Sequence, residues 1–275
     1  MLKKNILDFL VIIIIVTSLL MLACIAIGEF LPIQCLMIAL CGTLLFSYLG
    51  IRERTQDKKF HKPLLIIAFF LLLIPRLNPF LYNQADQDEG IYVNMASFFA
   101  MNGSLHIQDK VRQNLNKSER ILYDQNNHYT LKSNIPNQKY NTYPDKYEGV
   151  HSDAVYIKNL DSSIYTFQFY PLHPLWMSLF KIMFGKAYMI YSLTIFSILS
   201  ILGLGMLAYE IAGKKQSAFF IAVGLLAINP MHVFLSRFPV TENVSLFFSS
   251  FGFLYLIKWF KSKCLNQKKE KFYFL

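Results

Sequence analysis

Long uninterrupted runs of apolar residues dominate this sequence. Hydrophobic residues make up 54% of the 275 residues and charged residues only 16%, whereas a soluble domain carries about 25% charged residues. A helix needs about 20 apolar residues to cross the hydrocarbon core of a membrane. Six runs meet this requirement cleanly or nearly so: 6–27, 33–51, 63–82, 187–212, 217–235 and 241–260. The pattern excludes a soluble enzyme, a coiled coil and a disordered chain, and it predicts an all-α polytopic membrane protein.

Basic residues flank the apolar runs and give the chain a formal net charge of +10. In a soluble protein this charge would suggest a nucleic-acid partner. Here 15 of the 27 basic residues form four short clusters beside the apolar runs, which is typical of topology signals, so no nucleic-acid partner is expected. The clusters lie within residues 3–4, 52–62, 214–215 and 258–271.

The positions of these clusters predict the orientation of the spans, because basic loops tend to stay in the cytoplasm. A shorter apolar segment, 171–184, is of a length more often found at an interface than across a membrane. If it does not cross, six spans place all four clusters in the cytoplasm. The sequence therefore predicts a multi-pass protein of the cell membrane, with a cytoplasmic N-terminus and an extracytoplasmic loop over residues 83–169.

We divide the chain at the second basic cluster. Residues 1–62 form an N-terminal transmembrane hairpin and a basic cytoplasmic loop, and residues 63–275 hold the other spans and the exterior loop. The first apolar run lacks a small-x-small cleavage site and is interpreted as a retained span. The exterior loop is expected to contain short helices and a strand or two. The four cysteines form no CxxC pair, so neither a disulfide framework nor a zinc site is expected.

The exterior loop opens with adjacent acids, Asp88-Glu89, followed by apolar residues at helical spacing and by Gly103. This pattern predicts a short amphipathic helix on the outer membrane surface, with the acids in its first turn. Acids at that position can simply favour the start of a helix. Two adjacent carboxylates at an interface could also supply a general base and a cation ligand.

Two later segments carry further candidates. Residues 170–185 have prolines at the start and a closing glycine, which predicts a second interfacial helix; its His173 is either an interfacial side chain without a chemical role or part of a site. In the segment 229–243, Arg237 either contacts lipid head groups or binds a substrate phosphate, and Arg76 has the same two interpretations. Glu242 is either a helix-terminal charge or a site acid.

The order of these motifs resembles the GT-C glycosyltransferases, and within them the protein O-mannosyltransferases and lipid A aminoarabinose transferases. The resemblance covers roughly residues 63–260. It consists of an Arg at the outer end of a span, Asp-Glu-Gly-x-Tyr-x-x-x-Ala, Tyr-Pro-x-x-Pro-Leu…Phe-Gly, and Asn-Pro…Ser-Arg-x-x-x-x-Glu. The chain departs from the family in two respects: the hairpin 6–51 precedes the usual first span, and the sequence holds six spans where relatives commonly have eleven or more.

This resemblance implies a GT-C-like helical bundle, of which 63–275 is the N-terminal part of the catalytic domain, and a polyprenyl-phosphate-linked sugar as donor. It also implies that Asp88 is the catalytic base with Glu89 beside it, and that Glu242 is a second acid near the acceptor. Arg76 and Arg237 would bind the donor phosphate, and Tyr92 and His173 would form the site wall. If a divalent cation (Mg²⁺ or Mn²⁺) takes part, the three acids are its candidate ligands, and their carboxylates must then converge.

The implied function is transfer of a sugar to an acceptor hydroxyl on the extracytoplasmic face, by a chain that is expected to be incomplete on its own. Two other functions stay open. A transporter or flippase of lipid-linked intermediates would have ionisable residues at mid-membrane and helices broken there. A non-catalytic membrane assembly partner would explain the small number of spans. The sugar, the acceptor (protein, lipid or glycan) and the oligomeric state are not encoded in any motif.

The charge pattern generates a direct test of topology. A reporter fused after Lys214-Lys215 should be cytoplasmic, and a reporter fused within residues 104–168 should be exterior, because each placement keeps all four basic clusters in the cytoplasm. Protease protection of both fusions in sealed membranes measures this. A cytoplasmic location for residues 185–187 would contradict the six-span arrangement and would separate Glu242 from Asp88.

Overall fold

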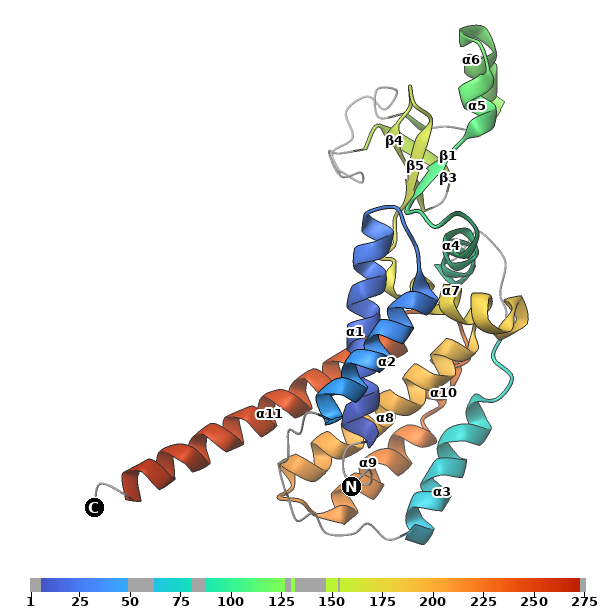
Figure 1. The fold of residues 1–275 in the computed structure, drawn as a ribbon. Helices are drawn as coiled ribbons and strands as arrows, with labels where there is room; N and C mark the ends of the chain where they lie inside the picture. The colour runs from blue at the N-terminus through green and yellow to red at the C-terminus, as the bar shows by residue number, and fades with distance from the viewer. Residues whose placement is uncertain are drawn as a thin grey trace, which may run out of the picture.

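A computed structural model describes residues 6–48, 62–80, 88–126, 130–131, 147–152 and 154–272. The protein is mostly helical, with one small sheet (Figure 1). The described parts of the predicted apolar segments are largely helical, although not each forms one continuous helix. They correspond to α1 (Ile6–Ala26), α2 (Pro32–Tyr48), α3 (Lys62–Leu73) with the 3₁₀ turn η2 (Ile74–Arg76), α8 (Tyr191–Ile211), α9 (Gln216–Ala227) with α10 (Pro230–Leu235), and α11 (Glu242–Phe272).

Three helical stretches of the described chain are long and apolar enough to cross a membrane: Leu7–Ala26, Lys186–Ile211 and Glu242–Lys263. Three shorter apolar helices lie at Pro32–Leu44, Ile66–Arg76 and Gln216–Ala227. These helices are compatible with a membrane protein, while the count of six spans and their orientation stay predictions. Residues 49–51 and 81–82, at the ends of two predicted spans, lie outside the described residues.

The predicted span 217–235 is interrupted. The helix α9 ends at Ala227, and α10 starts at Pro230 after Asn229, whose side chain accepts a hydrogen bond of 2.9 Å from the backbone N–H of His232. A proline has no N–H to continue the preceding helix, and Asn is a favoured helix cap. The dipeptide Asn229-Pro230 therefore converts one apolar run into two helices.

The loop 83–169 contains a five-stranded antiparallel sheet of order β1-β5-β4-β3-β2, where the sequence predicted only a strand or two beside short helices. The strands are short, with two to five residues each, and register shifts interrupt two of their pairings. Such strands leave little of the alternating pattern that a sequence can reveal. Their bounds are β1 (His106–Gln108), β2 (Thr130–Leu131), β3 (Gly149–Ser152), β4 (Val155–Asn159) and β5 (Ile164–Phe167).

Arg112 holds the outer part of this loop together. It lies in α5 (Lys110–Asn114), and its guanidinium pairs bidentately with Asp124 of α6 (Lys117–Asn126) at 2.7 and 2.8 Å. It also donates to the backbone carbonyl of Leu160 and to the hydroxyl of Ser163, in the turn between β4 and β5. Because Arg112 is only 4% exposed, these contacts satisfy a buried charge and fix both helices against the sheet.

Two helices connect the sheet to the bundle (Figure 1). They are α4 (Asp88–Asn102), whose first turn holds the predicted acids and which ends before Gly103 at φ +66°, and α7 (Leu172–Phe184). Both were predicted as surface helices, yet every residue of α7 from His173 to Leu179 is buried. The hydroxyl of Ser178 donates to the carbonyl of Ala96 at 2.7 Å, which ties the two helices together.

The helix α8 lies in the middle of the bundle and packs closely on two sides. A Cβ at Gly203 would lie 2.5 Å from the hydroxyl of Ser250 on α11, and a Cβ at Gly205 would lie 2.6 Å from a methyl group of Val223 on α9. Small residues at such positions let helix backbones approach each other. The two glycines therefore set the distances from α8 to α11 and to α9.

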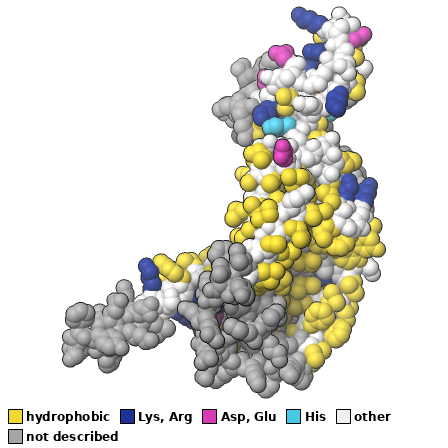
Figure 2. Space-filling view, in the orientation of Figure 1, with side chains coloured by type: hydrophobic (Ala, Val, Ile, Leu, Met, Phe, Trp, Pro, Cys, Tyr) yellow, Lys and Arg dark blue, Asp and Glu magenta, His cyan; other side chains and the backbone are white. Residues whose placement is uncertain are grey.

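The surface divides into an apolar and a charged part. Hydrophobic side chains cover the helices in Figure 2, and most of the visible charged side chains lie over the sheet and over α5 and α6. On α3 and α9, large apolar side chains such as Phe69 and Leu225 are 53% and 65% exposed. So much exposed apolar surface is unfavourable in water and is expected on helices that face lipid.

The packing of α8 predicts opposite effects for two glycine substitutions. Gly205→Ala should lower the melting temperature in detergent, because overpacking a close helix contact costs about 1–3 kcal/mol. The matched control is Gly224→Ala, where no heavy atom lies within 4 Å of the new Cβ. Since alanine favours a helix by about 1 kcal/mol over glycine, the control should melt at the same or a higher temperature. Equal melting of both variants would contradict the close α8–α9 contact.

Candidate functional site

The first turns of α4 and α11 approach the same tyrosine. Tyr92, one turn into α4, lies within hydrogen-bonding reach of the side chain of Thr241, which directly precedes α11. Asp88 and Glu242, the first residues of the two helices, are both exposed and both lie near enough to Tyr92 to raise its pKa. The structure thus brings Asp88 and Glu242, which are distant in sequence, to the same side chain.

Tyr92 itself is largely enclosed, with 7% of its surface exposed. Burial is the largest cause of its raised pKa, followed by the side chain of Thr241, which opposes the rise, and by the two carboxylates. Its ring packs against Phe169 at 4.9 Å and edge-on against His173 at 5.3 Å between centroids. The phenol therefore stays protonated at neutral pH and presents an O–H group between two acids.

His173 is buried at the start of α7, 2% exposed, and burial lowers its pKa to about 3. The backbone of Pro239 opposes this shift but forms no hydrogen bond of normal geometry with the ring, and among the described residues neither ring nitrogen has such a partner. A neutral imidazole cannot act as an acid at physiological pH. The structure therefore shows His173 as an enclosed side chain that packs edge-on against the ring of Tyr92.

The segment between α10 and α11 contributes residues that the sequence did not single out. Besides Thr241, Pro239 lies close to His173, and Asn243, in the first turn of α11, is buried with a side-chain amide nitrogen that has no hydrogen-bond partner among the described residues. From its position directly before α11, Thr241 is expected to be no more than a helix cap. The signal for its second contact is long-range, since the partner, Tyr92, belongs to another helix.

Arg237 lies at the edge of this segment and is partly exposed. Two of its guanidinium nitrogens donate to the carbonyl of Asn78, at 3.0 and 3.3 Å, and the guanidinium stacks 4.4 Å from the ring centre of Phe80. The backbone N–H of Phe80 in turn donates to the carbonyl of Arg237 at 2.7 Å. The side chain is thus held in place while part of its surface stays accessible.

Arg76, the other predicted phosphate ligand, is fully buried. Its guanidinium donates to the hydroxyl of Ser197 at 2.8 Å and to the carbonyls of Leu72 and Ala227 at 2.9 and 3.4 Å, and it bonds Nδ1 of His232 at 3.1 Å. Among the described residues no carboxylate pairs with it. These contacts engage the side chain inside the bundle, so it does not face a ligand in this conformation.

The acids do not assemble into a metal centre within the described part of the chain, where no group of three or more His, Cys, Asp or Glu residues is arranged to hold a metal ion. Glu89 follows Asp88 in the same turn and is half-buried. The expected cation site of Asp88, Glu89 and Glu242 therefore finds no support in the geometry of these side chains. The chemistry considered below uses no metal.

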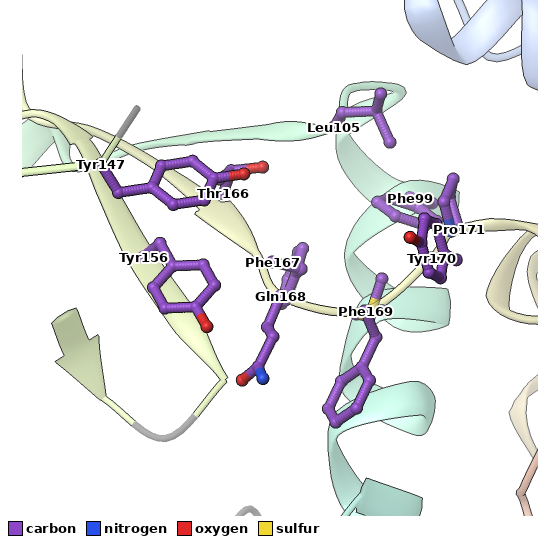
Figure 3. A pocket seen from close by; sticks show the side chains of 11 residues that line it. Phe99, Leu105, Tyr147, Tyr156, Thr166, Phe167, Gln168, Phe169, Tyr170 and Pro171 are labelled. Atoms are coloured by element: carbon purple, nitrogen blue, oxygen red, sulfur yellow. The ribbon is translucent and has the colours of Figure 1, made fainter. Parts of the chain in front are cut away.

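A cavity of about 440 Å³ lies beside the site, between α4, the sheet and the segment that leads from β5 to α7 (Figure 3). Aromatic side chains line much of it, and Tyr147 and Tyr156 stack with their ring centres 4.6 Å apart. Phe169 belongs both to this lining and to the contact with Tyr92. The cavity is therefore separated from Tyr92 by a single ring.

Comparison of the chain with models of known families, with curated proteins and with solved structures finds no match. The likeness to GT-C glycosyltransferases thus depends on the short motifs alone.

The burial of His173 predicts how stability depends on pH. The unfolded chain protonates this histidine near its ordinary pKa of about 6.5, whereas the folded chain keeps it neutral down to about pH 3. Between these values the unfolded state binds more protons, so the free energy of unfolding should fall as the pH falls, by up to about 1.4 kcal/mol per pH unit. His173→Phe removes this titration and should flatten the fall in melting temperature between pH 7 and pH 5.

The matched control is His106→Gln, because His106 is exposed on the sheet. Its melting temperature should follow the wild-type slope more closely than that of His173→Phe. A wild-type slope retained in His173→Phe would show that this histidine is not the buried neutral group described here.

Proposed function

We propose that the protein takes part in transfer of a sugar from a polyprenyl-phosphate carrier to an acceptor hydroxyl on the outer face of a membrane. The observation that carries this proposal is the approach of Asp88 and Glu242 to Tyr92. Both acids stand at helix starts and face solvent, so a substrate can reach them. Both acids contribute to the raised pKa of Tyr92, after burial, which is its largest cause.

The proposed reaction is a single displacement at the anomeric carbon. The acceptor oxygen forms a bond to this carbon as the bond between the carbon and the phosphate oxygen breaks, with inversion. Asp88 accepts the proton of the acceptor hydroxyl, and the polyprenyl phosphate leaves with the electrons of the broken bond. The carboxylate of Asp88 is exposed at the start of α4, so a substrate hydroxyl can reach it.

Tyr92 and Glu242 orient the reacting groups in this proposal. The phenol keeps its proton because burial and two nearby negative charges disfavour the phenolate. It can therefore donate a hydrogen bond to a substrate oxygen or to Asp88. Glu242 accepts from a second hydroxyl of the acceptor, and Glu89 contributes to the negative potential of this turn.

Of the two arginines, Arg237 is the better candidate for the leaving phosphate. A guanidinium binds phosphate through paired N–H groups, and Arg237 keeps part of its surface accessible at the end of α10. Arg76 contacts Ser197, Ala227 and His232, so we assign it a structural role and not binding of the phosphate. The aromatic cavity would receive the acceptor, because the apolar faces of sugar rings pack on aromatic rings.

One observation favours a transporter of lipid-linked intermediates as the second candidate. Arg76 and His232 lie buried together where α9 is broken, and transporters use ionisable residues and broken helices inside the membrane. In that case Arg76→Gln would abolish movement of a labelled lipid-linked sugar across vesicle membranes, while Asp88→Asn would leave it intact. The glycosyltransferase proposal predicts the reverse dependence of sugar transfer on these two residues.

The test of the proposed function is transfer of radiolabelled sugars from polyprenyl phosphate in membranes of the native host. Asp88→Asn keeps the shape of the side chain and removes the base, so the rate should fall by about 10²–10⁴. The abundance of the chain should change little, because an exposed charge at a helix start is worth only about 0.3–1 kcal/mol.

The control is Asp161→Asn, which neutralises an exposed acid in the turn between β4 and β5 and should keep the wild-type rate. Tyr92→Phe keeps the ring contacts with Phe169 and His173 and removes only the hydroxyl, so it should lower the rate without lowering abundance. Normal transfer by Asp88→Asn would exclude Asp88 as the catalytic base.

A further inference from the structure

Two cysteines face each other at one end of the N-terminal hairpin. Cys24 lies in the last turn of α1 and Cys35 in the first turn of α2, and their sulfur atoms are 3.6 Å apart. Cys35 is 2% exposed and Cys24 is partly exposed. No sulfur of the other described cysteine, Cys41, takes part in this contact, and Cys41 is exposed.

The turn of the hairpin fixes this pairing. The backbone N–H of Glu29 donates to the carbonyl of Cys24, and the N–H of Cys35 donates to the carbonyl of Leu31, both at 3.0 Å. Gly28 has a φ of +86°, which lets the chain reverse directly after α1. Both cysteine backbones are thus held by hydrogen bonds of the same short turn, and the sulfur contact does not depend on a flexible loop.

We propose that Cys24 and Cys35 form a disulfide in the mature protein. The charge pattern places this end of the hairpin outside the cytoplasm, where disulfides persist. The sulfur contact of 3.6 Å already brings the two thiols together, and the covalent bond would shorten it to about 2.05 Å. No sequence motif predicts this bond, because the two residues have no CxxC spacing.

The oxidant in this proposal is the disulfide of an exterior thiol–disulfide oxidoreductase. The thiolate of Cys24, the more accessible sulfur, attacks one sulfur of that disulfide and releases the other as a thiolate. The thiolate of Cys35 then attacks the sulfur of Cys24 in the mixed disulfide and releases the reduced enzyme. The chain loses two electrons and two protons, and the oxidoreductase gains them as two thiols.

The bond would hold together the end of the hairpin that packs against α4. Phe30, in the turn, packs against Gly103 at the end of α4, where a Cβ would lie 3.6 Å from the backbone nitrogen of Phe30. Cys24, Cys35 and Phe30 belong to the same apolar core as Met95 and Phe99 of α4. A covalent link between α1 and α2 therefore restricts movement of this end of the hairpin where it packs against α4.

The experiment counts thiols in the full chain in native membranes. Free thiols are first blocked with N-ethylmaleimide after an acid quench, and the chain is then reduced and treated with a polyethylene-glycol maleimide that adds visible mass to each new thiol. The wild type should gain two adducts that depend on reduction. Cys24→Ser and Cys35→Ser should gain none, and the matched control Cys41→Ser should still gain two.

A linked peptide in a non-reducing digest of the wild type gives a second measurement that needs no variant. Recovery of the Cys24 segment joined to the Cys35 segment supports the proposal even if a serine variant is not produced. Complete blocking of all four wild-type cysteines before reduction overturns it, and so does a disulfide that survives in Cys24→Ser. The readout requires no sugar transfer, so its result is independent of the proposed function.

Discussion

The helix α8 packs closely against both α9 and α11, and the position of the candidate site depends on these contacts. Gly203 and Gly205 bring α11 and α9 against opposite sides of α8. Since α10 and the segment before α11 connect these two partners, they are confined to the end of the bundle at which α9 stops and α11 starts. That end is where Thr241 reaches Tyr92 and where Pro239 lies close to His173. The close packing at Gly203 and Gly205 of α8 thus determines which residues lie next to Tyr92 of α4.

Buried polar groups near the candidate site differ from those elsewhere in whether they have hydrogen-bond partners. Arg112 and Arg76 are both buried and are engaged by hydroxyl and carbonyl groups of their surroundings. His173 and Asn243, in contrast, keep buried polar atoms without a partner among the described residues. Buried atoms of this kind are costly and are uncommon away from functional positions. His173 packs against Tyr92, and Asn243 lies in the first turn of α11, next to Glu242.

The sequence predicted the parts of the fold that local patterns encode. Apolar runs located the bundle helices, and Gly103 and Gly185 marked the ends of α4 and α7, as capping glycines do. The sheet was underestimated, because strands of two to five residues with register shifts carry almost no periodicity. The break at Asn229-Pro230 was missed because apolar residues continue on both sides of it. The burial of α7 was missed because an amphipathic pattern does not tell lipid from protein as the apolar neighbour.

The contacts of Arg76 also constrain how the chain assembles as it is made. Its hydrogen-bond partners Ser197 and His232 lie 121 and 156 residues further along the chain. Until those residues are synthesised, the guanidinium has to stay hydrated, because an unpaired charge in an apolar environment is very costly. The end of α3 next to Arg76 therefore has to stay accessible to water while more than a hundred further residues are synthesised. It can pack into the bundle only after α8 and the helices α9 and α10 have formed. Although α3 is synthesised before α8, α9 and α10, it packs into the bundle after them.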